Sequence, residues 1–242
     1  MSLFLKTLFQ FFLPPQCNCC ETFIEEGRQG LCSDCLSAVR WIEPPFCTQC
    51  GNPFVPRQGK GHLCGRCLDQ KRYFTIGRAL GHYEGPLREA IHRWKYEEKI
   101  YLSSLFGEWM ERSFSQYWKA SLFDLLVPVP LHPQRLRERG FNQALLLVRE
   151  LSHRTGIPYR KRLLEKRERT VPQVHLSGVD REKGVKGAFG LAEREGVQGK
   201  VILLVDDVYT TGATVNECAR VLIAGGAQRV DVFTLAHAVM GS

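Results

Sequence analysis

The sequence lacks several features that would place it in a large class of proteins. No apolar run reaches the roughly 18 residues that a membrane-spanning helix needs. It also has no Gly-x-x-x-x-Gly-Lys-Ser/Thr run, so a P-loop nucleotidase is not the leading alternative. Its 242 residues are 44% hydrophobic and 24% charged, a globular composition that excludes long disorder, collagen and coiled coil. A chain of this length forms one large domain, or one domain of ordinary size plus a small one.

The first 13 residues are mostly apolar around one lysine, but they lack the order of a signal peptide. Lys6 lies inside the apolar stretch rather than ahead of it, no small-residue cleavage site follows, and Pro14-Pro15 leads directly to cysteines. We therefore expect residues 1–13 to form a short amphipathic helix that docks on the folded body, and the protein to be cytoplasmic. The alternatives are secretion and peripheral contact of this helix with a membrane surface.

Nine of the ten cysteines lie between residues 17 and 67, and eight of them form Cys-x-x-Cys pairs: Cys17/Cys20, Cys32/Cys35, Cys47/Cys50 and Cys64/Cys67. Two intervening residues place both thiolates on one side of a tight turn, and two such pairs complete a four-cysteine zinc site. A disulfide framework is the alternative, which the missing export signal disfavours. Pairing in sequence order predicts two structural zinc ions, and an interleaved pairing remains open. Cys19 is either an alternative ligand or a bystander.

The cysteine cluster ends at Cys67, so we place a domain boundary at about Tyr73. Residues 1–73 are expected to hold the N-terminal helix and the zinc ribbons. From residue 74 to 242, short apolar runs alternate with helix-like stretches, the pattern of an α/β sheet. Strands are expected at 76–83, 125–129 and 201–205. Helices are expected from Gly85-Pro86, over 100–118, and over 142–155, where Gly156 ends the third.

The most informative segment runs from residue 201 to residue 214. Five consecutive apolar residues, 201–205, predict a central parallel strand buried on both faces. Asp206 and Asp207 follow at its carboxyl end, where open α/β sheets bind ligands. The next residues predict a tight turn into a helix and a phosphate cradle: Thr210, Thr211, Gly212, Ala213 and Thr214. Carboxylates beside a phosphate site accept hydrogen bonds from sugar hydroxyls or help to hold a divalent cation, so the segment predicts a ribose 5-phosphate site.

This segment resembles the phosphoribosyl pyrophosphate (PRPP) signature of type I phosphoribosyltransferases. Over nearly its whole length the chain also resembles the ComF (competence protein) family, whose members look like a double zinc ribbon joined to a phosphoribosyltransferase domain. The stretches that carry the resemblance are 83–88, 95–96, 127–131, Arg135, Arg137, 139–143, Arg169, 172–173, Leu176, Arg181 and 187–189. One departure is Gly184, which stands where the family usually has Asn.

The resemblance implies a type I phosphoribosyltransferase-like parallel sheet flanked by helices and preceded by a small Cys-rich double zinc ribbon. It implies that Asp206 and Asp207 are the catalytic carboxylates and take the ribose hydroxyls, and that residues 210–214 take the 5-phosphate. Lys95 and Arg139 are candidates for the pyrophosphate side. Pyrophosphate leaves from C1 while positive charge develops on the ribose, so cations and Mg²⁺ must take up the departing negative charge.

The positive charge of the chain is concentrated in one segment. Residues 131–186 hold 14 Lys and Arg against 6 Asp and Glu, an excess equal to the +8 of the whole chain. Such a segment closes over a phosphorylated substrate or tracks a nucleic-acid backbone, and a solvated basic face is the alternative. The residues assigned to this flexible or nucleic-acid-binding loop are Arg167, Arg169, Gln173 and Arg181.

Three functions remain open at this point. The first is a phosphoribosyltransferase that uses PRPP with an unknown acceptor, for example in nucleobase salvage. The second, which the resemblance implies, is a factor for natural transformation that handles single-stranded DNA with DNA-uptake proteins as partners. The third is a PRPP sensor without turnover. No residue is evidently a general base, and His92, His132 and His175 are weak candidates.

Overall fold

The computed structural model describes residues 15–24, 30–54, 60–167, 185–193 and 195–238. The expected N-terminal helix over residues 1–13 lies outside the described residues. So do Arg169, Gln173, His175 and Arg181. Within the described part of the chain, no helix combines the length and the apolar character needed to cross a membrane.

A parallel sheet of four strands lies at the centre, in the order β1-β6-β5-β2. Its strands are β1 (Gly77–His82), β2 (Leu125–Pro128), β5 (Val201–Tyr209) and β6 (Arg229–His237). The inner strands β5 and β6 are buried along most of their length, as expected for apolar runs covered on both faces. A short antiparallel pair, β3 (Leu164–Lys166) and β4 (Phe189–Leu191), forms a second sheet. The α/β class with a parallel sheet is confirmed.

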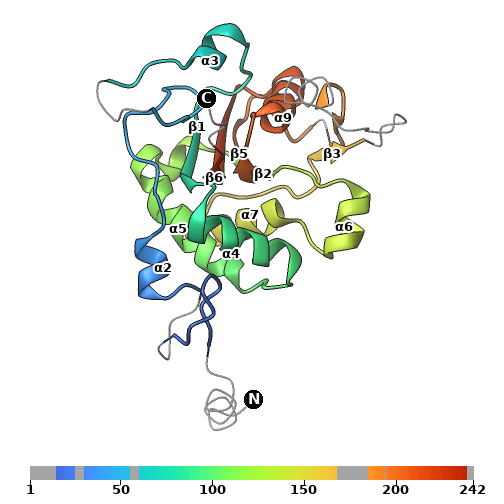
Figure 1. Ribbon diagram of the computed structural model, residues 1–242. Coiled ribbons are helices and arrows are strands. Elements are labelled where there is room, and N and C mark those ends of the chain that lie inside the picture. Colours follow the sequence, from blue (N-terminus) through green and yellow to red (C-terminus); the bar gives the residue numbers. More distant parts are fainter. Residues whose placement is uncertain (1–14, 25–29, 55–59, 168–184, 194, 239–242) are drawn as a thin grey trace.

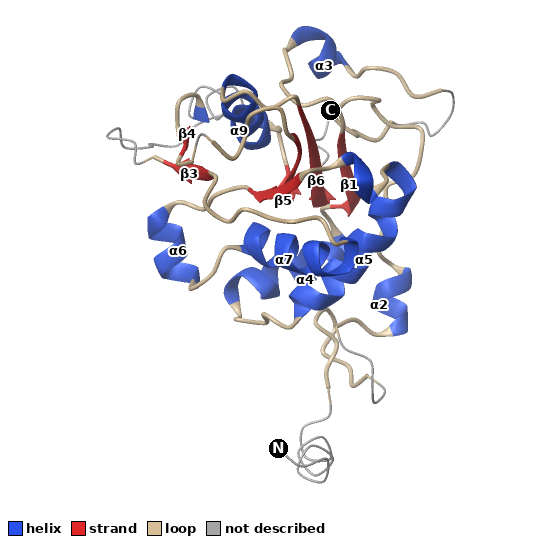
Figure 2. Ribbon diagram, turned by 180° about the vertical axis from the view of Figure 1, so that it is seen from behind, coloured by secondary structure: helices blue, strands red, loops and turns tan. Residues whose placement is uncertain are grey.

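Helices cover both faces of the sheet (Figures 1 and 2). On one face lie α4 (Gly85–Tyr96), α5 (Leu102–Tyr117) and α7 (Gln143–Thr155), and on the other lies α9 (Ala213–Ala224). A 3-10 turn, η1 (Ala120–Leu122), follows α5. Trp94, Phe106 and Leu147 are fully buried where the first three helices meet the strands. The predicted end of α7 is confirmed, since Gly156 ends it at a φ of 75°, and the helix begins one residue after the predicted start because Asn142 caps it.

The structure differs from the sequence-based expectation in several places, and the strands β3, β4 and β6 were not predicted. Strand β5 continues past Val205 to Tyr209, so Asp206 and Asp207 lie inside its last part. The reason is that β6 is equally long and pairs with this part, Asp206 opposite Thr234 and Tyr209 opposite His237. Helix α6 (Pro133–Arg139) was not predicted, because its only apolar residue leaves no helical periodicity.

The two zinc-ribbon segments lie on opposite faces of the sheet. The first, which contains α2 (Ser33–Ser37), places Leu31 and Val39 in the same apolar core as α4, α5 and α7. The second, which contains α3 (Gly65–Asp69), places Cys47 and Cys50 in the core beneath α9. In Figure 1, α2 and α3 accordingly lie at opposite ends of the molecule. The boundary at about Tyr73 stays a prediction from sequence, and apolar side chains from its two sides pack together.

Candidate sugar-phosphate site and zinc centres

The carboxylates of Asp206 and Asp207 lie at the carboxyl edge of the parallel sheet. Because side chains alternate along a strand, the two point to opposite faces. On the helix-rich face, Lys95 of α4 places its Nζ 2.8 Å from Oδ2 of Asp207. Only 13% of the Lys95 side chain and 16% of the Asp207 side chain are exposed, so this ion pair is largely shielded from water.

Asp206 faces the side of β3 and α9. The backbone N–H of Asp207 donates to Oδ1 of Asp206 at 2.9 Å. Burial and the neighbouring charge of Asp207 raise the pKa of Asp206 to about 7, against the opposing fields of Lys95 and Lys166. Burial in turn lowers the pKa of Lys166, and repulsion from Arg135 adds to this effect. Lys95 therefore lies beside Asp207 on one face of β5, and the charge of Lys166 acts on Asp206 on the other.

The loop after β5 forms a sharp turn into α9. Gly212 caps the helix at a φ of 78°, a conformation that favours glycine. Thr211 is buried, and its Oγ1 accepts a hydrogen bond from the N–H of Ala213 at 3.2 Å. The first N–H groups of a 12-residue helix and the positive end of its dipole attract an anion here. The structure also adds a steric reason for Gly212, since a Cβ at this position would overlap the Tyr209 ring.

Arg139 is the last residue of α6, and its side chain contacts Tyr96, the residue that follows Lys95. Its guanidinium carbon lies 4.8 Å from the centre of the Tyr96 ring, and Nη2 donates to the Tyr96 hydroxyl at 2.8 Å. Lys95 and Tyr96 are consecutive at the end of α4, so the two cations assigned to the pyrophosphate side lie on neighbouring elements. The histidine candidates have structural contacts: the ring of His92 lies against Tyr96, and His132 caps α6.

The eight paired cysteines gather into two groups of four, in sequence order: Cys17, Cys20, Cys32 and Cys35, then Cys47, Cys50, Cys64 and Cys67. The Sγ atoms of Cys20 and Cys32 are 3.7 Å apart, and those of Cys50 and Cys64 are 3.6 Å apart. A tetrahedral ion with bonds of about 2.3 Å to sulfur separates its ligands by roughly 3.8 Å. All ten cysteines are free thiols, and Cys19 belongs to neither group. The two sites therefore fit two structural zinc ions, and the interleaved pairing is wrong.

Comparison with known proteins agrees with this architecture. Residues 8–68 match the double zinc ribbon domain, and residues 142–239 match the phosphoribosyl transferase domain. Competence protein F of Haemophilus influenzae is 31% identical over 227 residues, which cover 92% of this chain and 97% of that protein. The chain belongs to the ComF family. DNA utilization protein YhgH of Escherichia coli is 33% identical over 227 residues, covering 92% and 97%, and Competence protein ComFC of Streptococcus pneumoniae is 30% identical over 211 residues, covering 85% and 86%.

Among solved structures, the glutamine PRPP amidotransferase of Bacillus subtilis shares 25% identity with this ComF-family chain. That similarity covers 56% of this chain and 26% of the other, with a TM-score of 0.38.

One residue that faces Asp206 was not predicted in this ComF-family chain, since Lys166 counted only as part of the basic segment. Arg135, which counted only as part of the resemblance, is exposed and acts on Lys166 by charge repulsion. No local pattern identifies Lys166, because β3 has three residues and only its pairing with β4 directs Lys166 toward Asp206. Arg167, assigned to the loop, is exposed and lies 3.5 Å from Glu165.

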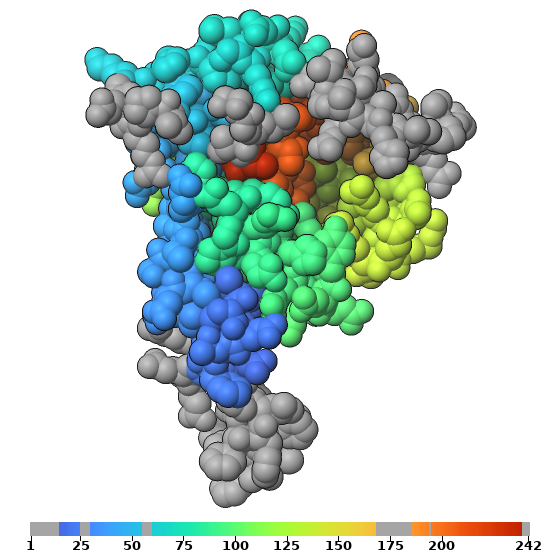
Figure 3. All heavy atoms as spheres, in the orientation of Figure 1, coloured from blue at the N-terminus to red at the C-terminus, as the bar shows by residue number. Residues whose placement is uncertain are grey.

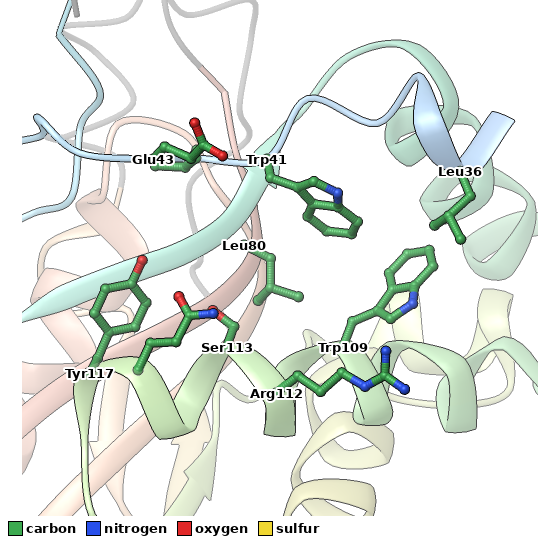
Figure 4. A pocket seen from close by; sticks show the side chains of 10 residues that line it. Leu36, Trp41, Glu43, Leu80, Trp109, Arg112, Ser113 and Tyr117 are labelled. Atoms are coloured by element: carbon green, nitrogen blue, oxygen red, sulfur yellow. The ribbon is translucent and has the colours of Figure 1, made fainter. Parts of the chain in front are cut away.

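A separate cavity of about 450 Å³ lies between the first zinc-ribbon segment and α5. The rings of Trp41 and Trp109 meet edge to face in its wall at 5.3 Å, near Leu80 (Figure 4). None of the residues assigned to the sugar-phosphate site lines this cavity. This cavity therefore lies apart from the candidate sugar-phosphate site.

Proposed function

We propose that this chain binds PRPP together with Mg²⁺ at the carboxyl end of β5, and that it acts in the cytoplasm in DNA uptake through single-stranded DNA. One observation carries the first part. Asp206 and Asp207 lie in the last part of the buried central strand β5, and Gly212, in the short loop that follows this strand, caps the start of α9. A ribose whose hydroxyls meet the carboxylates then has its 5-phosphate at the start of that helix.

The proposed roles follow from charge. The carboxylates of Asp206 and Asp207 accept hydrogen bonds from the ribose hydroxyls, and residues 210–214 hold the 5-phosphate. Lys95 balances Asp207 in the absence of ligand, and it serves the pyrophosphate side together with Arg139. The carboxylate oxygens also fit Mg²⁺, which prefers one or two carboxylates plus substrate phosphates. When bound, Mg²⁺ supplies electrostatic stabilisation of the leaving pyrophosphate.

The DNA role rests on the relatives and on charge. Two relatives carry the names Competence protein F and DNA utilization protein YhgH. Helix α6 adds the exposed Arg135 and Arg137 to Arg167, in the segment that holds the positive charge of the chain. A row of such side chains follows a phosphate backbone without sequence preference.

Titration of PRPP with Mg²⁺ into the full-length zinc-loaded protein tests the proposal. The double variant Asp206→Asn, Asp207→Asn keeps the shape but replaces both carboxyl groups by neutral amides, and one lost hydrogen bond to a charged acceptor costs roughly 1.5–3 kcal/mol. We expect its PRPP affinity to fall at least about tenfold, since about 1.4 kcal/mol is a factor of ten. Asp124→Asn, at the opposite edge of the sheet, is the control. Equal affinities of the double variant and the wild type contradict the proposal.

A second measurement separates catalysis from sensing. A phosphoribosyltransferase releases pyrophosphate when a suitable nucleobase is added, and a PRPP sensor does not. A screen of nucleobases for pyrophosphate release from bound PRPP therefore decides between them. Release that disappears in the double variant establishes turnover at this site.

A further inference from the structure

The cavity of Figure 4 is an apolar groove beside α5 that the sugar-phosphate site leaves unused. Along α5 its wall runs from Trp109 to Tyr117, eight residues or about 12 Å of helix. Leu36 of α2 lies at the Trp109 end, and Trp41 and Leu80 contribute the other apolar side chains. Leu36 is 39% exposed, and both tryptophans are only half-buried. Such a groove fits an apolar segment that removes these side chains from water.

The chain itself contains an apolar segment of suitable length among residues 1–14, which lie outside the described residues. Four of its side chains recur at the i, i+3, i+4 and i+7 spacing of one helix face: Leu5, Leu8, Phe9 and Phe12. Lys6 and Gln10 fall on the other side of the same helix. The helix expected there is about 18 Å long over residues 2–13, so it covers the whole groove.

The first described residues start close to the groove. Pro15 is two residues before Cys17, and Leu36 directly follows Cys35. The Sγ atoms of Cys17 and Cys35 lie within 4.8 Å of each other in the first cysteine group. In Figure 3 the first described residues, in dark blue, lie against the lighter blue atoms that follow them in the chain. Fourteen residues extend to at most about 50 Å, so the segment reaches a groove that begins beside this zinc site.

Two observations favour the groove over a membrane surface as the cover of the apolar face. Helices that lie on membranes carry several Lys and Arg along the polar face, whereas residues 1–13 hold one charged side chain, Lys6. The match to the double zinc ribbon domain begins at residue 8, nine residues before Cys17. The family pattern of the ribbon therefore includes the second half of the segment.

We propose that residues 1–13 form a helix that docks into the groove between α2 and α5 of the same chain, with its apolar face against Trp41 and Trp109. The docked helix joins the first zinc ribbon to α5 and closes the groove to other partners. The inference does not depend on the PRPP site, because none of the residues assigned to that site lines the groove.

Hydrogen exchange of the full-length zinc-loaded protein tests the docking. An isolated helix of this length is marginal in water, so protection of its amides requires docking. We expect residues 4–13 to exchange at least about tenfold more slowly than a free peptide of residues 1–14. Ser113→Arg places a long charged side chain in the groove wall and should abolish this protection. Ser115→Arg, exposed on the same helix and outside the wall, should retain it.

A change in the segment itself gives a second readout. Leu8→Glu puts a charge on the apolar face, and the control Gln10→Glu puts the same charge on the polar face. A tethered segment competes at an effective concentration of about 1 mM. We therefore expect added peptide of residues 1–14 to bind the Leu8→Glu protein at least about tenfold more tightly than the wild type or the Gln10→Glu protein.

The other outcomes overturn the docking. Exchange of residues 4–13 as fast as in the free peptide shows that nothing holds the segment, and protection that survives Ser113→Arg places the helix elsewhere. Protection that rises with protein concentration assigns the segment to the groove of a second copy. Protection that appears only with anionic lipid vesicles assigns it to a membrane surface. If Ser113→Arg does not fold, the peptide decides, and a peptide that does not bind the Leu8→Glu protein overturns the proposal.

Discussion

Replacing Gly212 with alanine separates two reasons for a glycine in the phosphate loop. Gly212 and Gly156 have almost the same backbone conformation, with φ of 78° and 75°. A Cβ at 156 meets open space, whereas a Cβ at 212 overlaps the Tyr209 ring. Alanine at either position therefore has the same backbone cost, about 1–2 kcal/mol for the left-handed conformation. Gly212→Ala also inserts a methyl group into a packed site, which adds about 1–3 kcal/mol.

Denaturant unfolding of both variants at equal zinc content measures this difference. We expect Gly156→Ala to lose about 1 kcal/mol of unfolding free energy and Gly212→Ala to lose clearly more. Because the displaced ring is Tyr209, we also expect Gly212→Ala to weaken PRPP binding and to disturb the stack on His237. Equal losses of stability in the two variants would show that Tyr209 yields without cost, and would refute the steric argument.

Three further outcomes are expected. Metal analysis should find two zinc ions per chain. Because both ribbons share apolar cores with the sheet, chelation should lower the unfolding temperature of the whole protein in a single transition. Separate unfolding transitions for the ribbons and the sheet would contradict this. Arg167→Ala should reduce the salt dependence of single-stranded DNA binding by about one counterion, and Arg112→Ala, at the cavity of Figure 4, should not. Asp231 is fully buried and accepts a hydrogen bond from the Trp118 indole. Asp231→Ala should therefore lower the unfolding free energy by about 3–5 kcal/mol, and the exposed Asp124→Ala should lower it by about 1 kcal/mol or less. Similar losses in the two variants would refute this.

Local patterns predicted much of this protein. The Cys-x-x-Cys spacing predicted the zinc ligands, because two intervening residues suffice to turn both thiolates to one side. The apolar run 201–205 predicted the central strand, and Gly156 predicted the end of α7, because a C-terminal cap acts within a few residues. By contrast, α6 was missed because its polar sequence carries no apolar periodicity.

The sequence by itself determined the class of the protein: eight zinc ligands, an α/β sheet and a strand-carboxylate-loop-helix segment. Only the tertiary structure decided which cysteines share an ion and that the two ribbons lie on opposite faces of the sheet. It also paired Lys95 with Asp207 and brought Trp41 against Trp109 of α5. The physical reason is that these contacts join segments far apart in the chain, and they form only when buried apolar faces fix the packing of helices and ribbons on the sheet.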